Sequence, residues 1–117
     1  MTRHAFLIGA PGPANAANFL PGVDFDMKNY IQFLVSPSGG AWEKHEITPL
    51  LNPSKQKLLG LLQASAAEYV LIIFSGHGST NTRTKATMLA INESETVKST
   101  QLKTPATKQL EPVKIYK

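Results

Sequence analysis

An unbroken apolar run near the middle of the chain limits the possible folds more than any other feature. The run Val70–Phe74 contains five apolar residues, most of them β-branched or aromatic, and it is followed by Ser75 and Gly76. A run of this length is too short to span a membrane, and its continuous pattern is typical of a strand that is buried on both faces. The run therefore predicts a strand in the middle of a parallel sheet.

A histidine follows this predicted strand between two glycines, Gly76 and Gly78. In open α/β sheets, ligands bind at the carboxyl ends of the strands, which is where His77 would lie. Glycine lets the backbone turn sharply and approach a ligand closely, and an imidazole exchanges protons near neutral pH. His77 is therefore a candidate functional residue, with a structural role in capping the loop as the alternative.

The residues before this run predict two further strands and two helices. Short apolar runs predict strands over His4–Gly9 and Ile47–Leu51. The order is then strand, helix, strand, helix, strand, which indicates an α/β fold with a three-layer αβα arrangement and a mostly parallel, doubly wound sheet.

Apolar residues at helical spacing define the first helix, within residues 20–34. They are Met27, Tyr30, Ile31 and Leu34. Asp24 or Asp26 can cap the start of this helix and would also favour its positive end.

The second helix is expected to be capped by Asn52, with Pro53 at its first position, where proline is favoured. Its predicted buried stripe consists of Leu58, Leu61, Leu62 and Ala66.

After Gly78 the chain becomes polar and basic. Ser79–Lys85 is expected to be irregular, Thr87–Ile91 to form a short strand, and Thr96-Val97 to return as a hairpin. Val113–Tyr116 alternates like the start of another strand. We therefore expect one domain over residues 1–117, in which residues 79–117 form a partly irregular segment and the sheet is incomplete on its C-terminal side.

Composition excludes several classes of protein. The net charge is +4, and it arises after residue 78, where there are seven basic and three acidic residues. These lysines are spread out with one aromatic residue among them, so we expect no nucleic-acid partner. There is no cysteine and no apolar stretch of membrane-spanning length, so we expect no disulfide, no membrane partner and a location in the cytoplasm.

Two sequence boxes give the chain a resemblance to a known family. Leu71–Gly78 resembles the histidine box of the caspase and metacaspase superfamily, in which a hydrophobic strand runs into S-G-H-G. Gly22–Asn29 resembles the G-x-D-x-D-x-x-N helix start of the same family, and Thr87–Val97 resembles its small hairpin after the histidine. The resemblance implies a caspase-like fold and a cysteine-type endopeptidase, a hydrolase that acts in proteolysis.

The resemblance also implies roles for individual residues. His77 would assist formation of a cysteine thiolate and protonate the leaving amine, and the Gly78 N–H would donate to the oxyanion. Asp26 and Ser75 match metacaspase positions that bind an arginine or lysine side chain of the substrate. The caspase arginine that binds a substrate aspartate would fall at Leu20, which cannot do so, and we therefore expect a cationic substrate residue.

The chain departs from the family in lacking the nucleophile. The caspase cysteine follows the histidine by about 50 residues, a position beyond Lys117. We expect a protein or peptide substrate, no cofactor and no metal, and a second chain or further segment that carries the cysteine; the sequence gives no indication of calcium dependence. The alternatives are a pseudo-caspase that binds or scaffolds partners, and a small-molecule-binding α/β domain.

Overall fold

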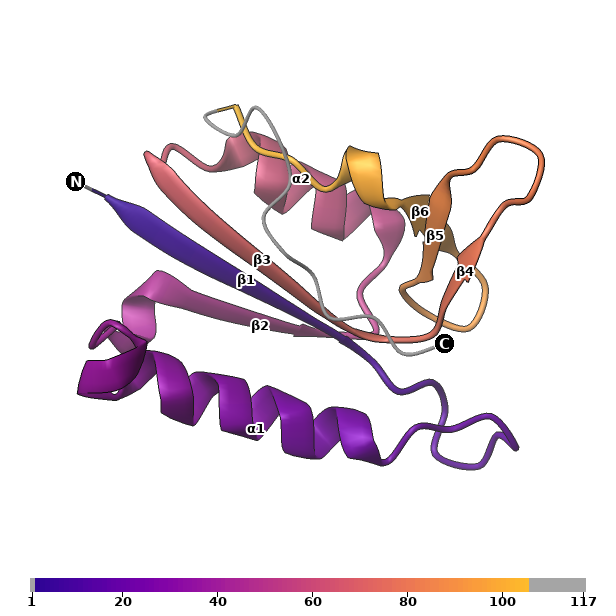
Figure 1. The fold of residues 1–117 in the computed structure, drawn as a ribbon, viewed down its shortest axis with the longest axis horizontal. Coiled ribbons are helices and arrows are strands. Elements are labelled where there is room, and N and C mark those ends of the chain that lie inside the picture. Colours follow the sequence, from indigo (N-terminus) through magenta and orange to yellow (C-terminus); the bar gives the residue numbers. More distant parts are fainter. Residues whose placement is uncertain (1, 106–117) are drawn as a thin grey trace.

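Residues 2–105 are described by a computed structural model and form an α/β fold around a small parallel sheet (Figure 1). The sheet has the strand order β2-β1-β3, and helices α1 and α2 lie on its opposite sides. The bounds are β1 Arg3–Ala10, α1 Gly22–Val35, β2 Ile47–Leu51, α2 Lys55–Ala64 and β3 Tyr69–Gly76. The predicted α/β class, with helices covering both faces of a parallel sheet, is therefore confirmed.

Strand β1 is central and pairs with both of its neighbours in parallel. It pairs with β3 over its whole length, from Arg3 opposite Tyr69 to Ala10 opposite Gly76, and with β2 from Ala5 to Gly9. Strand β3 is the predicted apolar run, and its residues from Ile72 to Gly76 are all buried.

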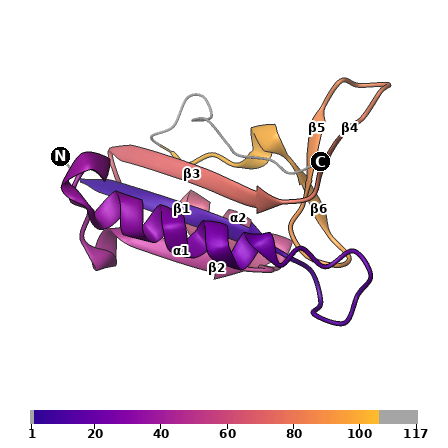
Figure 2. The same ribbon diagram turned by 60° about the horizontal axis from the view of Figure 1, so that its bottom comes forward.

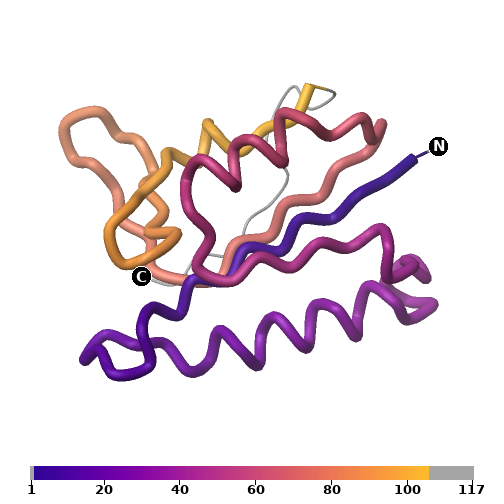
Figure 3. Tube along the Cα trace, turned by 180° about the vertical axis from the view of Figure 1, so that it is seen from behind, coloured from indigo at the N-terminus to yellow at the C-terminus, as the bar shows by residue number. Residues whose placement is uncertain are grey.

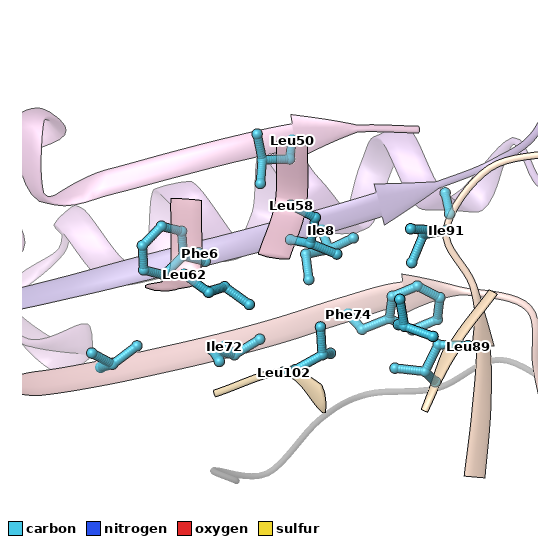
Figure 4. Close-up of a cluster of buried hydrophobic side chains, with 13 residues drawn as sticks. Phe6, Ile8, Leu50, Leu58, Leu62, Ile72, Phe74, Leu89, Ile91 and Leu102 are labelled. Carbon is cyan, nitrogen blue, oxygen red and sulfur yellow. The ribbon is translucent and has the colours of Figure 1, made fainter. Parts of the chain in front are cut away.

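Alternation along β1 divides the core into two clusters, one on each face of the sheet. Ala5 and Leu7 belong to a cluster with three residues of α1, namely Val23, Met27 and Leu34. Phe6 and Ile8 belong to a second cluster with two residues of α2, namely Leu58 and Leu62 (Figure 4). Successive side chains of a strand point to opposite faces, so one continuous apolar strand serves both clusters.

Helix α1 covers the residues that the periodicity predicts, but neither aspartate caps it. The N-cap position is Pro21, and no side chain accepts a hydrogen bond there. Asp24 forms an exposed ion pair with Lys28 at 3.0 Å, and Asp26 accepts a hydrogen bond from Ser75. The capping prediction is wrong for both residues because the helix begins at Gly22, so both aspartates lie inside it. Asp24 is nevertheless in the first turn, where its charge favours the positive end of the helix as predicted.

Helix α2 begins two residues later than the sequence predicts. Ser54 is the N-cap and accepts a hydrogen bond from the Lys57 N–H at 3.2 Å, whereas Asn52 has a positive φ of 45° and its N–H donates to the Gly9 carbonyl. Leu58 and Leu62 are fully buried as predicted. Leu61 and Ala66 are exposed, which makes that part of the predicted stripe wrong: Leu61 lies at the edge of the packed face, and Ala66 lies beyond the helix end.

The segment after β3 forms a second, antiparallel sheet with the order β4-β5-β6. Its strands are β4 Gly78–Thr80, β5 Thr87–Ala90 and β6 Thr96–Lys98, and three short 3₁₀ helices complete the structure at Pro37–Gly39, Lys44–Glu46 and Ser99–Gln101. The hairpin of β5 and β6 is confirmed, whereas part of the segment predicted to be irregular is strand β4. The strand predicted at Val113–Tyr116 lies outside the described residues. No helix within residues 2–105 has both the length and the apolarity needed to cross a membrane.

The packing predicts opposite effects for two glycine-to-alanine substitutions. A Cβ at Gly39 would lie 1.8 Å from the Phe33 carbonyl oxygen, whereas a Cβ at Gly60 in α2 would meet no atom within 4 Å. We expect Gly39→Ala to lower the free energy of unfolding by about 2 kcal/mol or more, and Gly60→Ala to raise it by about 0.5–1 kcal/mol. Urea denaturation of the two variants measures both changes; equal effects would contradict the packing around Gly39.

Candidate functional site at the carboxyl edge of the sheet

The candidate site lies at the carboxyl edge of the parallel sheet, between β1 and β3. The chain runs from β1 toward β2 on one side and returns to β3 on the other, so β1 and β3 flank the point where the strand order reverses. The loop after β1 and the hairpin after β3 extend from this same edge (Figures 2 and 3). Ligands of open α/β sheets bind at this reversal point.

His77 is held across this edge by the loop that follows β1. Its ring Nε2 lies 3.0 Å from the carbonyl oxygen of Asn18. A carbonyl can only accept a hydrogen bond, so Nε2 carries the proton and donates it. In the neutral ring the lone pair is therefore on Nδ1, and Nδ1 is the nitrogen that can accept a proton from a reacting group.

Gly76 allows β3 to reach the end of β1 without a clash. It pairs with Ala10, and an added Cβ would lie 3.0 Å from both the Cβ and the carbonyl oxygen of Ala10 and 2.9 Å from Phe74. Contacts this short are rare or absent at real side chains, so a larger residue would require Phe74 or the end of β1 at Ala10 to shift. The close approach places His77 directly beside the exit of β1.

The Gly78 N–H points away from the hairpin. The Ala90 N–H donates to the His77 carbonyl at 3.0 Å, one residue outside the pair that Gly78 forms with Leu89. In an antiparallel ladder this arrangement makes Gly78 and Leu89 a non-hydrogen-bonded pair. The Gly78 N–H therefore points away from β5. It belongs to the residue that directly follows His77 in the chain.

Ser75 and Asp26 form a hydrogen bond across the face of the sheet that α1 covers. The Ser75 hydroxyl is fully buried and donates to Asp26 Oδ2 at 3.1 Å, while Asp26 itself is half-buried. A buried hydroxyl can no longer hydrogen-bond to water, so the Asp26 carboxylate replaces water as its acceptor. The same hydrogen bond orients the carboxylate.

A pocket of about 320 Å³ adjoins His77, within the range of small-molecule sites. The residues that line it come from the loop after β1 and from the hairpin: Ala10, Pro11, Gly12, Pro13, Ala16, Asn18, His77, Ala90, Asn92 and Glu93. Glu93 is the one acidic residue in this lining, and no lysine or arginine of the described chain contributes to it. Its carboxylate gives the pocket a negative rim.

The turn that carries Glu93 is anchored to helix α2 by its neighbours. The Glu95 carboxylate accepts hydrogen bonds from the Lys55 N–H at 3.1 Å and from Asn92 Nδ2 at 3.0 Å, and Asn92 Nδ2 also donates to the Pro53 carbonyl. Two hydrogen bonds lower the pKa of Glu95 from its ordinary value: the bond from Asn92 has the larger effect, and the bond from the Lys55 N–H has the smaller. Lys55 is the first residue of α2, so the carboxylate also lies at the positive end of that helix.

The four residues singled out from the sequence fall into two pairs. His77 and Gly78 lie together at the strand end, and Ser75 and Asp26 bond to each other beneath α1. Neither Ser75 nor Asp26 lines the pocket beside His77. Sequence reasoning missed Asn18 and Glu93. The Asn18 contact is made by a backbone carbonyl, which every residue type has. Glu93 lies between the predicted strand Thr87–Ile91 and its return at Thr96-Val97, and nothing in the sequence indicates that this connection lies beside His77.

Comparison with models of protein families, with curated proteins and with solved structures found no match to this chain. Within residues 2–105, no group of three or more histidine, aspartate or glutamate side chains is arranged to hold a metal ion. The site is therefore interpreted from its own geometry.

The hydrogen bonds of Glu95 predict a pH-dependent contribution to stability. A carboxylate whose pKa is lowered by folding stabilises the folded state above its unfolded pKa of about 4.3, and this contribution is lost as the pH falls through the lower folded value. We expect Glu95→Gln to unfold at a lower urea concentration than the parent at pH 7, with a smaller difference at pH 3. The control is Glu93→Gln, an exposed neighbour for which we expect little change at either pH. An equal loss in Glu95→Gln at both pH values would contradict the charged role of Glu95.

Proposed function

We propose that the chain provides the histidine-bearing part of a caspase-like cysteine endopeptidase. The observation that carries this proposal is the hydrogen bond from His77 Nε2 to the Asn18 carbonyl, at the strand-reversal point of a parallel sheet. This bond fixes the ring so that Nδ1 can act as the proton acceptor. The S-G-H-G sequence at the same position supports the family resemblance.

The proposed reaction divides the work among four residues. Nδ1 of His77 removes the proton from a cysteine thiol that a further segment or a second chain supplies, and the thiolate attacks the peptide carbonyl. The Gly78 N–H donates to the oxyanion that forms, and His77 then returns its proton to the leaving amine. Asp26, oriented by the buried Ser75 hydroxyl, binds the substrate residue before the cleaved bond.

Two features favour a cationic residue at that position. Asp26 is a carboxylate next to a buried hydroxyl, and a carboxylate can form a two-pronged, charge-assisted pair with a guanidinium. Glu93 adds a second negative charge at the rim of the pocket beside His77. An acidic substrate side chain would meet repulsion at both places, and Leu20 offers it no partner.

One observation favours a second candidate function. These 117 residues contain no cysteine, so by themselves they cannot form the thioester acyl-enzyme of a cysteine peptidase. A pseudo-caspase would use the same pocket and the same fixed histidine to bind a peptide without cleaving it.

The first test is whether peptidase activity depends on His77. We expect the 117-residue chain alone to show no turnover of fluorogenic peptides ending in arginine, lysine or aspartate. We expect turnover when the residues encoded after Lys117, or a second chain that carries the cysteine, are supplied, and a loss of about 100-fold or more in kcat/KM for His77→Ala.

The matched control for this test is His45→Ala, because the His45 side chain is 77% exposed and lies at the other end of the sheet. Full activity in His77→Ala, or no activity in the completed protein, would overturn the peptidase proposal. Peptide binding without cleavage, lost in His77→Ala, would support the pseudo-caspase instead.

The second test concerns substrate selection by Asp26. In the completed protein, Asp26→Asn removes the charge but keeps an acceptor for Ser75. If Asp26 binds the substrate cation, kcat/KM for arginine peptides should fall by a factor on the order of ten to a hundred, as expected for a charged hydrogen bond of about 1.5–3 kcal/mol. Asp24→Asn is the control, since Asp24 is exposed on the same helix turn and pairs with Lys28. Equal arginine cleavage by Asp26→Asn and the parent would show that Asp26 does not bind the substrate.

A further inference from the structure

A larger pocket lies at the opposite, amino end of the sheet. Its volume is about 570 Å³, compared with about 320 Å³ for the pocket beside His77. Strand residues His4, Phe6 and Thr48 line it together with Leu61 and the small residues at the end of α2. None of the residues of the candidate functional site contributes to it.

The mismatch between helix and strand lengths explains why this space exists. Helix α2 has ten residues and is about 15 Å long, whereas β1 has eight residues and is about 26 Å long. From Ala64, the last residue of α2, the chain returns to β3 through Ser65, Ala66 and Ala67, and all four residues line the pocket. These small side chains leave space that leucine or phenylalanine would fill.

The pocket combines an apolar lining with a few convergent polar groups. The His4 ring hydrogen-bonds the Thr48 hydroxyl through Nε2 and contacts the Phe6 ring, with centroids 4.5 Å apart. Leu61, Ala64 and Ala66 supply aliphatic surface on the other side. This composition is typical of pockets that bind small organic molecules.

Two charged side chains that line the pocket, Arg3 and Glu46, form an ion pair with each other. Arg3 Nε lies 3.0 Å from Glu46 Oε2, and the Arg3 guanidinium stacks 4.4 Å from the centroid of the Trp42 ring. His45 lies 3.4 Å from Glu43. A charged ligand would have to displace one of these partners, whereas an uncharged ligand would not.

The surroundings of His4 favour its uncharged form. Partial burial lowers its pKa from the ordinary value, and the nearby His45 acts in the same direction, while Glu46 opposes them. A neutral imidazole both donates and accepts hydrogen bonds, and the Thr48 hydroxyl does the same. The pair can therefore form a hydrogen bond with a ligand hydroxyl or amide, whether that group acts as the donor or as the acceptor.

We propose that this pocket is a binding site for a small, uncharged aromatic molecule with a hydroxyl or amide group. The aromatic ring would pack against Phe6, Leu61 and the alanines, and its polar group would hydrogen-bond His4 or Thr48. The proposal does not depend on the peptidase function, because the two pockets lie at opposite ends of the sheet and share no lining residue.

The experiment is an NMR titration of the ¹⁵N-labelled chain with four probes of similar size. Phenol and benzamide are uncharged, and benzoate and benzylammonium carry one negative or positive charge. We expect saturable amide shifts at His4, Thr48, Leu61 and Ala66 with the two uncharged probes, at least tenfold weaker binding of the two charged probes, and no saturable shift at Asn18 or His77.

A pocket-filling variant provides the second measurement. Ala64 is exposed and lines the pocket, so Ala64→Trp should fill it and weaken benzamide binding at least tenfold. Gln56→Trp, on the exposed part of the same helix and outside the lining, should bind as the parent does. Absence of saturable shifts with the uncharged probes, tighter binding of a charged probe, or unchanged binding in Ala64→Trp would each overturn the proposal.

Discussion

The parallel pairing of β1 with β3 is the constraint on which the rest of the structure depends. Because the register runs without a break from Arg3 opposite Tyr69 to Ala10 opposite Gly76, both strands end at the same level. The loop after β1 and the turn after β3 therefore leave side by side, and the Asn18 carbonyl can reach His77. A shift of one residue in this register would turn each apolar side chain to the other face of the sheet and separate these two groups.

This pairing also explains how so short a chain supports two cores. Residues 5–10 of β1 are all apolar and alternate between the face that α1 covers and the face that α2 covers, so neither face is polar in this part of the strand. The hairpin after β3 completes the core on the α2 side with Leu89, Ile91 and Val97, together with Leu102 of the following segment (Figure 4). The same hairpin provides Glu93 at the rim of the candidate site, so packing and site geometry depend on one element.

The sequence was sufficient to predict the elements that hydrophobic pattern specifies. The buried run before Gly76, the helical spacing of Met27 and Leu34 and the β5–β6 hairpin were all recognisable because burial leaves a periodic signature. The start of α2 was predicted incorrectly because Asn52 and Ser54 are equally good caps locally. The Asn52 side-chain oxygen instead accepts a hydrogen bond from the Gly12 N–H in the loop after β1, and Ser54 caps the helix. The capping role of Asp26 was predicted incorrectly because the helix begins four residues earlier, at Gly22, which places Asp26 inside it.

The candidate site was predictable in part for a related reason. His77 was recognisable because a polar residue between glycines after a buried strand is unusual, whereas the Asn18 carbonyl was not, because any residue type offers the same oxygen. The length of the helix relative to the strands, which creates the second pocket, depends on where α2 ends. Residues 64–67 are three alanines and a serine, which could equally well have extended the helix. The sequence alone therefore does not indicate where α2 ends or that a pocket forms there.

The outer edge of β3 bears directly on where a nucleophile could come from. Among residues 2–105, β3 pairs with β1 alone, although its side chains are buried by layers on both faces. A strand that paired with this edge in parallel would end level with Gly76, and the first residue beyond it would lie beside His77. An antiparallel strand would instead bring its amino end there and carry its last residue to the opposite pocket. The peptidase proposal therefore requires a parallel partner strand that ends in cysteine, because catalysis needs the thiolate next to Nδ1 of His77.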